Sequence, residues 1–358
     1  MEEKPIQYES CDHHLHGISI EEKIIRNCCL TTPSGCNTPI LEINYDGETI
    51  DWEKIFARKL KNIEYLKKKK LGGCKNCYAL EFKEWDEEKF ISHINFNHWT
   101  TCNSRCVYCD VDKKRKNTSK RILPSIKNLV DLGLFKNSGE ITFQGGEPTL
   151  LEEFEDLLSF FIEKKTTIRI HSSGIIYSPA IGEGINQGLV SIVISPDAGS
   201  KKVYEKLKKV KYFKKVWSNI AKYKESDKSI KSNLVSVKYI IVPGYNDNIK
   251  ELNNWLNLIK LNNITSAIID FEYTYTRKNI HKISPHLYML LDYIREKLNQ
   301  NNIKYSLYDS AIYAMKCKSK YLGENLSTNS IFYKTILQIY RILNKQLNIK
   351  YPWKKIVN

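Results

Sequence analysis

The chain has 358 residues, 42% of them hydrophobic, which is enough for one substantial core with smaller appendages. It shows no basic-apolar signal pattern at its start and no apolar run near the roughly 20 residues that span a bilayer, so we expect a cytoplasmic protein without a membrane span. The net charge of +16 would suit a nucleic-acid partner, but the lysines recur along most of the chain, as in residues 67–70, 113–116 and 201–215, which favours a solvated surface and makes nucleic acid an unlikely partner. Ten cysteines in a reducing compartment indicate metal ligands rather than disulfides.

Residues 1–90 differ in pattern from the rest of the chain. Apolar residues on either side of a charged turn predict a short hairpin over 17–29, and a helix is expected over 52–68, before a turn at Gly72-Gly73-Cys74. We assign this segment as a cysteine-rich N-terminal extension.

Between residues 91 and 275, short β-rich runs alternate with longer amphipathic stretches, which predicts βαβ units around a parallel sheet. The predicted strands are residues 92–97, 140–143, 167–171, 191–195, 235–242 and 267–271. The predicted helices are residues 125–134, 151–164, 180–187, 201–209, 214–225 and 249–259. The fold class is therefore α/β, a partial (β/α)6 TIM-like barrel. Residues 276–358 form a mainly helical C-terminal extension, with helices at 285–298 and 331–347 and a strand at 304–307.

Three closely spaced cysteines follow the first predicted strand of this barrel. In NFNHWTTCNSRCVYCD, three residues separate Cys102 from Cys106, and two separate Cys106 from Cys109. A four-iron cluster normally takes four thiolates, so three thiolates leave one iron with an open position for a substrate or cofactor. A structural zinc site with His98 as the fourth ligand is the alternative.

This spacing, with Tyr108 as the aromatic residue before the last cysteine, resembles the radical S-adenosylmethionine (radical SAM) superfamily. The second predicted strand runs into Gly145-Gly146-Glu147-Pro148, which resembles the GGEP motif of that family. Alone, this run would indicate a turn before a helix. The resemblance implies a [4Fe-4S] cluster on Cys102, Cys106 and Cys109, and cleavage of S-adenosylmethionine to a 5′-deoxyadenosyl radical that removes a substrate hydrogen.

The resemblance also implies cofactor-binding residues at later strand ends. Ser172 lies in His171-Ser172-Ser173-Gly174, where relatives often carry Thr-Asn-Gly, and Ser195 ends the fourth predicted strand. Lys238 would face the cofactor carboxylate or reach solvent, and Val242 would provide apolar backing for the adenine. Asp270 and Glu272 would contact substrate or remain at the surface.

The cysteines of the first 80 residues resemble the auxiliary-cluster modules called SPASM and twitch domains, although those modules more often follow the barrel. The resemblance implies one four-cysteine cluster on Cys11, Cys28 or Cys29, Cys74 and Cys77, with Cys36 as a competing ligand. Structural zinc and unrelated buried thiols remain as alternatives. His13, His14 and His16 lie near Cys11 and could ligate a metal, but isolated histidines in a polar stretch are expected to be exposed. Cys317 is expected to lie in a core.

The function implied is a radical SAM enzyme that removes hydrogen from a peptide or a small metabolite, with an electron supplied by a flavodoxin- or ferredoxin-type donor. Other readings are an RNA-modifying radical SAM enzyme, an activase of a glycyl-radical enzyme, and a noncatalytic metal-binding scaffold. The positive charge supports RNA modification, but no RNA-binding motif accompanies it.

Overall fold

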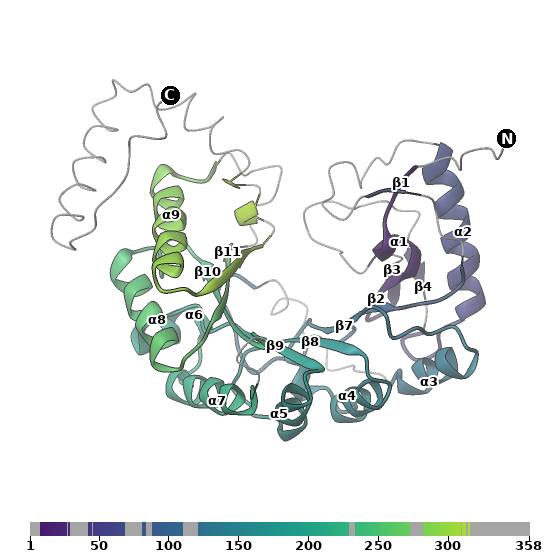
Figure 1. The fold of residues 1–358 in the computed structure, drawn as a ribbon, viewed down its shortest axis with the longest axis horizontal. Helices are drawn as coiled ribbons and strands as arrows, with labels where there is room; N and C mark the ends of the chain where they lie inside the picture. Colours follow the sequence, from purple (N-terminus) through teal and green to yellow (C-terminus); the bar gives the residue numbers. More distant parts are fainter. Residues whose placement is uncertain are drawn as a thin grey trace.

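The computed structural model of the protein describes residues 8–26, 28, 42–44, 46–68, 81–83, 88–109, 121–228, 233–272, 282–308, 310–312 and 314–315. Together they form an open crescent, in which a curved sheet lies inside a row of helices (Figure 1). The predicted helix over 331–347 lies outside the described residues. None of the described helices combines the length and the hydropathy that crossing a bilayer requires.

The sheet has ten strands in the spatial order β12-β11-β10-β9-β8-β7-β6-β2-β3-β4. All six predicted strands are present, each parallel to its neighbours, in sequence order along the sheet. They are β6 (His93–Asn97), β7 (Glu140–Phe143), β8 (Thr167–Ser172), β9 (Val190–Ile194), β10 (Val235–Ile241) and β11 (Ser266–Phe271). The predicted strand near residue 304 is β12 (Lys304–Leu307), which pairs in parallel with β11. The sheet does not close, which confirms the partial barrel.

Helices connect the strands and cover the convex side of the sheet (Figure 1). They are α3 (Leu123–Asp131), the 3-10 helix η3 (Pro148–Leu150), α4 (Phe154–Glu163), α5 (Pro179–Asn186), α6 (Lys201–Lys208), α7 (Phe213–Ser226), α8 (Ile249–Leu261) and α9 (Pro285–Gln300). Several of these helices have a polar residue at the N-cap. The Ser178 hydroxyl accepts a hydrogen bond from the amide of Ile181 in α5, and the Asn248 side chain accepts one from the amide of Glu251 in α8. These caps satisfy amides that the first helical turn leaves without partners.

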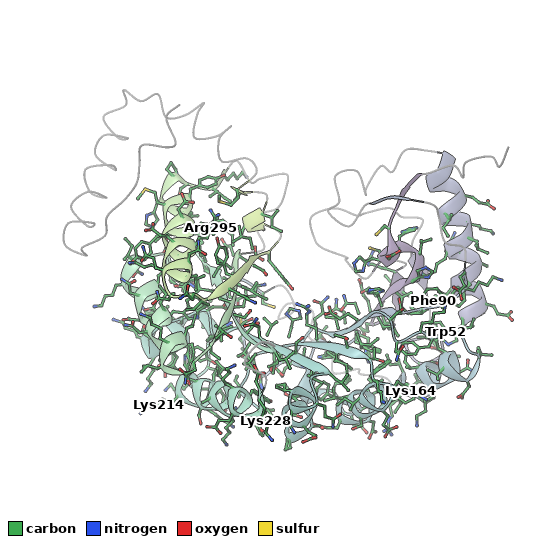
Figure 2. The ribbon with its side chains drawn as sticks, in the orientation of Figure 1. Trp52, Phe90, Lys164, Lys214, Lys228 and Arg295 are labelled. Atoms are coloured by element: carbon green, nitrogen blue, oxygen red, sulfur yellow. The ribbon has the colours of Figure 1, made fainter. Side chains whose placement is uncertain are left out.

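The two faces of the sheet differ in polarity. On β8, Ile168 and Ile170 are fully buried in the hydrophobic core shared with the helices, whereas Arg169 and His171 alternate with them and lie on the other face. Successive side chains of a strand point to opposite faces, so the concave face receives the polar set. The elements therefore place polar side chains inside the crescent, where Figure 2 shows them.

The N-terminal segment joins the same sheet. The predicted hairpin over 17–29 is present as β2 (Gly17–Glu21) and β3 (Ile24–Arg26), which pair antiparallel, and β4 (Glu42–Asn44) follows β3. Beyond the prediction, β2 pairs in parallel with β6, with Ile18 opposite Ile94. The sheet thus runs across residue 90, where we place the boundary of the N-terminal extension.

Three further elements complete this end of the crescent. Strands β1 (Tyr8–Ser10) and β5 (Glu81–Lys83) form a separate antiparallel pair. The short helix α1 (Asp12–His16) leads directly into β2, and α2 (Trp52–Lys68) is the helix predicted over 52–68. The Lys59 ammonium of α2 donates to the carbonyls of His14 at 2.9 Å and Gly17 at 2.6 Å, so α2 fixes the junction between α1 and β2.

Candidate active site

The segment that carries Cys102, Cys106 and Cys109, called the cysteine loop below, follows the carboxyl end of β6 (His93–Asn97). All three cysteines are partly exposed. Burial raises the pKa of Cys102 to about 11; the amide of Ser104, 3.4 Å from the sulfur, opposes this shift, whereas the charges of Glu147, Cys106 and Cys109 add to it. The Cys102 thiol is therefore protonated at neutral pH in the cofactor-free protein, and binding a metal there releases a proton.

His98, the fourth ligand in the zinc alternative, is buried in a different environment. Its Nε2 lies 3.6 Å from a carboxylate oxygen of Glu153, and its ring packs edge-on against Trp99. Within the described residues, no group of three or more His, Cys, Asp or Glu side chains is arranged to hold a single metal ion. The thiols and His98 thus do not form a tetrahedral site in this structure.

The Gly145-Gly146-Glu147 segment packs directly against the cysteine loop. The amide of Gly146 donates to the carbonyl of Trp99 at 3.2 Å, and the amide of Glu147 donates to the carbonyl of Thr101 at 2.8 Å. A Cβ atom on Gly146 would lie 2.1 Å from the Thr101 oxygen, and Gly145 has a φ of +108°, so this close approach requires glycine at both positions. The two motifs therefore form one site.

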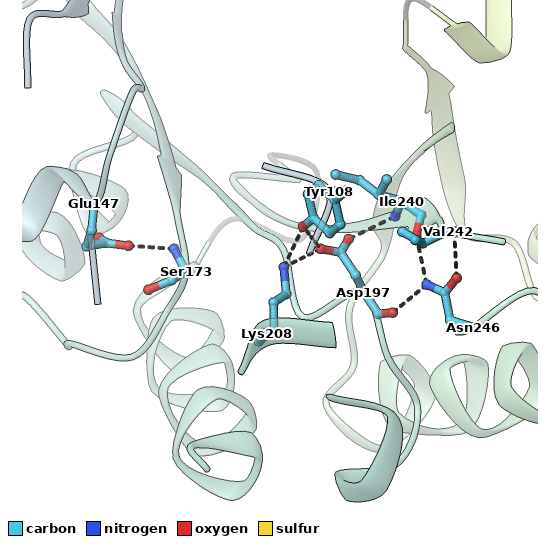
Figure 3. A network of polar contacts seen from close by, with 8 residues as sticks. All are labelled: Tyr108, Glu147, Ser173, Asp197, Lys208, Ile240, Val242 and Asn246. Carbon is cyan, nitrogen blue, oxygen red and sulfur yellow. Dashed lines mark hydrogen bonds and ion pairs between the residues drawn. The ribbon is translucent and has the colours of Figure 1, made fainter. Parts of the chain in front are cut away.

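Glu147 is buried and bridges toward the end of β8. Its Oε1 accepts the Ser172 hydroxyl at 2.8 Å. Its Oε2 accepts the amide of Ser173 at 2.7 Å, a hydrogen bond drawn in Figure 3. The Ser173 hydroxyl in turn donates to the Asn103 side chain at 2.9 Å, and the amide of Ser195 donates to the carbonyl of Ser172 at 3.2 Å. The structure thus brings Glu147, Ser172 and Ser195 together beside the cysteine loop.

A second network lies around Asp197, which follows the end of β9. The Tyr108 hydroxyl donates to Asp197 Oδ2, and the Lys208 ammonium donates both to that oxygen and to the Tyr108 hydroxyl, the latter at 2.7 Å (Figure 3). Burial by itself lowers the pKa of Lys208, but the Asp197 carboxylate and the nearby Cys106 outweigh it and raise the pKa above its usual value. The ammonium is therefore charged at neutral pH.

The same aspartate reaches the end of β10. Its Oδ1 accepts the amide of Ile240 at 2.8 Å, while its main-chain carbonyl accepts the side-chain amide of Asn246 at 2.7 Å. Asn246 also accepts the amide of Val242 at 2.7 Å. Leu207, Ile240 and Val242 form a small apolar cluster against which Tyr108 packs, so two of the predicted cofactor-binding residues, Tyr108 and Val242, meet here.

Lys238 pairs with an aspartate of the neighbouring strand β11. It is buried on β10, with its ammonium 3.7 Å from a carboxylate oxygen of Asp270 and 4.9 Å from the centre of the Tyr308 ring, so it does not extend into solvent. Burial, together with the charges of Lys238 and Arg169, lowers the pKa of His171 to about 3. These residues form a polar group on the concave face.

The N-terminal residues with possible ligand atoms are only partly described. Cys11 and Cys28 are buried and carry no disulfide, whereas Cys29, Cys36, Cys74, Cys77 and Cys317 lie outside the described residues. The expectation that His14 and His16 are exposed is wrong, because both are buried. The His16 ring stacks on Phe90 at 3.7 Å, and α2 covers the junction that contains His14.

Sequence reasoning missed Asp197, Lys208 and Asn246. Asp197 comes two residues after Ser195. A search for polar residues at the ends of the predicted strands, which selected Ser195, would therefore also have found Asp197. Lys208 was missed because it lies in a lysine-rich run, which we had assigned as a whole to the solvated surface. The structure corrects that assignment at this one position: Lys208 is 4% exposed, whereas the other lysines between 201 and 215 are exposed.

Residues 96–259 match the family model of the Radical SAM superfamily. This segment contains the cysteine loop, the two glycines and both polar networks. It belongs to the radical SAM superfamily, whose enzymes use a [4Fe-4S] cluster and S-adenosylmethionine.

Individual proteins and solved structures are also similar to this chain. The chain is 26% identical over 191 residues to a GTP 3′,8-cyclase of Vibrio atlanticus, a match that covers 51% of this chain and 54% of that protein. The chain thus spans about half the length of this curated relative. Among solved structures, SuiB of Streptococcus suis matches with a TM-score of 0.51 and 12% identity, over 89% of this chain and 76% of SuiB. SuiB bound to S-adenosylmethionine matches with a TM-score of 0.50 and 14% identity, over 71% and 56%.

Proposed function

We propose that the protein is an enzyme that binds a [4Fe-4S] cluster through Cys102, Cys106 and Cys109 and reductively cleaves S-adenosylmethionine. The observation that carries this proposal is the packing of the Gly145-Gly146 segment onto the loop in which Cys102, Cys106 and Cys109 follow β6. When bound, the cluster and S-adenosylmethionine supply a one-electron cleavage that yields methionine and a 5′-deoxyadenosyl radical able to remove a substrate hydrogen.

Different residues of the chain bind the cluster and the parts of S-adenosylmethionine. The three thiols take the cluster, and the backbone around Gly145 and Gly146 receives the methionine end of S-adenosylmethionine. Ser172 and Ser195 lie close to that end, since Ser172 is bonded to both Glu147 and the Ser195 amide. The apolar cluster of Leu207, Ile240 and Val242, with Tyr108 packed against it, backs the adenine. Glu147 keeps these strand ends at a fixed spacing.

We propose a peptide or a small metabolite as the substrate, bound on the concave face of the sheet. The curated relative from Vibrio is named for a reaction on GTP, a small molecule. The cysteines of the N-terminal extension, which resemble auxiliary-cluster modules, support a peptide. Arg169, bonded to Glu140 at 2.8 Å, and the Lys238–Asp270 pair supply polar groups of both signs on that face. The electron comes from a flavodoxin- or ferredoxin-type donor.

Cys11 and Cys28, with Cys29, Cys74 and Cys77, are the proposed ligands of an auxiliary iron–sulfur cluster. The two described thiols are buried and reduced, the state that ligation requires. Replacing Cys74 and Cys77 with alanine should lower the iron and sulfide content of the reconstituted protein. The spectroscopic response of the remaining cluster to S-adenosylmethionine should persist.

The experiment that tests the main proposal replaces Cys102, Cys106 or Cys109 with alanine. After anaerobic reconstitution and reduction with dithionite, the unmodified protein should convert S-adenosylmethionine to 5′-deoxyadenosine and methionine, measured by chromatography. Each variant should lose this conversion, because two thiolates do not retain the cluster. A variant that still cleaves S-adenosylmethionine, or zinc at these thiols in the purified protein, would refute the assignment.

A further inference from the structure

Lys208 and Asp197 form an ion pair inside the protein. The two side chains are in direct contact, with exposures of 5% and 0%. Removing two charges from water is costly, and apolar replacements of such pairs are often neutral or stabilising, so stability alone is a weak reason for this pair. The groups that the pair contacts give a better reason, because they come from both the cysteine loop and the end of β10.

The pair connects the cysteine loop to helix α6. The ammonium donates to the Tyr108 hydroxyl at 2.7 Å. Two main-chain bonds lie beside this contact, from the amide of Arg105 to the carbonyl of Lys208 and from the amide of Val107 to the carbonyl of Leu207, each at 3.0 Å. The loop is thus held by its backbone at two points and by its aromatic side chain at a third.

The same pair connects the loop to β10. Asp197 receives the Tyr108 hydroxyl on one carboxylate oxygen and the Ile240 amide on the other, so a single carboxylate bridges the two segments (Figure 3). Tyr108 lies between two of the cysteines, and Ile240 lies two residues before Val242. Carboxylate bonds of this kind are short and directional, which fixes the distance between the segments.

We propose that Lys208 is a positioning residue that, through Asp197 and Tyr108, sets the cysteine loop relative to the end of β10. This inference rests on the proposed function, in which the loop holds the cluster and the end of β10 backs the adenine. S-adenosylmethionine would then touch both segments at once, and its affinity would depend on their relative position. Lys208 itself makes no contact with the cofactor in this assignment.

The test measures S-adenosylmethionine binding to the cluster-loaded protein. Lys208→Met removes the ammonium and keeps an unbranched side chain, and Lys208→Arg keeps the charge. Lys206→Met is the matched control, because Lys206 lies exposed on the same helix. Each reconstituted protein is reduced with dithionite and titrated with S-adenosylmethionine, while the electron paramagnetic resonance spectrum of the cluster is recorded.

We expect Lys208→Met to retain the iron and sulfide content of the unmodified protein but to bind S-adenosylmethionine about 10- to 100-fold more weakly, the equivalent of one charge-assisted hydrogen bond. Lys206→Met should titrate like the unmodified protein, and Lys208→Arg should recover most of the affinity. If Lys208→Met titrates like the unmodified protein, the inference is wrong. If the unmodified spectrum does not respond to S-adenosylmethionine at all, the proposed function fails instead.

Lys208→Met leaves the Asp197 carboxylate buried without its cation, which can unfold the protein. The double variant Asp197→Asn/Lys208→Met removes both charges, and its asparagine oxygen can still accept the Ile240 amide. This variant should unfold in urea at a concentration close to that of the unmodified protein and still bind S-adenosylmethionine weakly. Recovery of full affinity in the double variant would overturn the positioning role.

Discussion

Asp197 illustrates how one residue can serve several segments. Its φ of +50° lies in the left-handed region, which costs a non-glycine residue about 1 to 2 kcal/mol and which aspartate tolerates better than most. In this conformation its carbonyl bonds Asn246 while its carboxylate faces Tyr108. A residue confined to the ordinary strand region would direct its carbonyl elsewhere. The strained backbone of Asp197 is therefore what lets it bond Asn246 and Tyr108 at the same time.

At the same scale, the burial of His14 predicts how the free energy of unfolding depends on pH. Burial, and secondarily the charge of Lys59, lowers the pKa of His14 to about 3, so the imidazole is neutral in the folded protein. In the unfolded chain it takes up a proton below its ordinary pKa of about 6.5. Its contribution is therefore fully present above pH 6.5 and is lost, by about 1.4 kcal/mol per pH unit, as the pH falls toward 3.

The measurement is urea unfolding of the cofactor-free protein at pH 6.5 and pH 5. The fall in unfolding free energy between these two values should be smaller by about 1 to 2 kcal/mol in His14→Gln, which cannot be protonated. Equal falls in the two proteins would show that His14 is not buried as a neutral imidazole.

Residue roles were predictable from the sequence where a motif fixed them. Cys102, Cys106, Cys109 and the two glycines could be named because their spacing is local. The burial of His14 and Lys208 could not, because both lie in runs of polar residues, and what buries them comes from segments distant in the chain. Local composition carries no information about such contacts.

Among the elements, the close contact between the β7 loop and the cysteine loop gives a direct test. Gly146→Ala places a Cβ 2.1 Å from the Thr101 oxygen, a separation that backbone atoms cannot tolerate, so the cysteine loop must move. We expect reconstituted Gly146→Ala to hold much less iron and sulfide than the unmodified protein, measured by chemical analysis.

Gly133→Ala is the control for this test. Gly133 has a φ of +70° and nothing within 4 Å of an added Cβ, so alanine there costs only the backbone strain, about 1 kcal/mol. It should load cluster normally. Normal loading in Gly146→Ala as well would mean that the two loops do not share a site.

The strands of the barrel could be predicted because a buried parallel strand requires apolar runs of characteristic length. Strands β6 to β11 agree with the predicted ranges to within about two residues, the usual variation in assigned element ends. Helix α1 was not predicted, since Asp-His-His-Leu-His has no apolar periodicity. The parallel pairing of β2 with β6 was also beyond prediction, because its partner lies far away in the sequence.

For the whole molecule, that pairing predicts that the N-terminal segment and the barrel unfold together. Ile18 on β2 is fully buried in the core that also contains Ile94, Phe96 and Ile141. Ile18→Ala should lower the free energy of unfolding by about 2 to 5 kcal/mol. Because the core is shared, helical circular dichroism and tryptophan fluorescence should report one transition at the same lowered urea concentration.

Two separate transitions, with only the earlier one shifted, would show instead that the N-terminal strands are an independent unit. The matched comparison is Ile220→Ala on α7, since Ile220 is likewise fully buried but lies at the barrel helices. Both variants should lower the same single transition.

The placement of β2 also has a consequence for the order of events on the ribosome. A strand near the start of the chain finds its parallel neighbour only after His93–Asn97 has emerged, so everything between Glu21 and His93 must be synthesised first. Until then, the edge of β2 that pairs with β6 has no partner strand. Newly made protein would be most vulnerable to aggregation and proteases during that interval, before the strand that leads into the cysteine loop arrives to cover it.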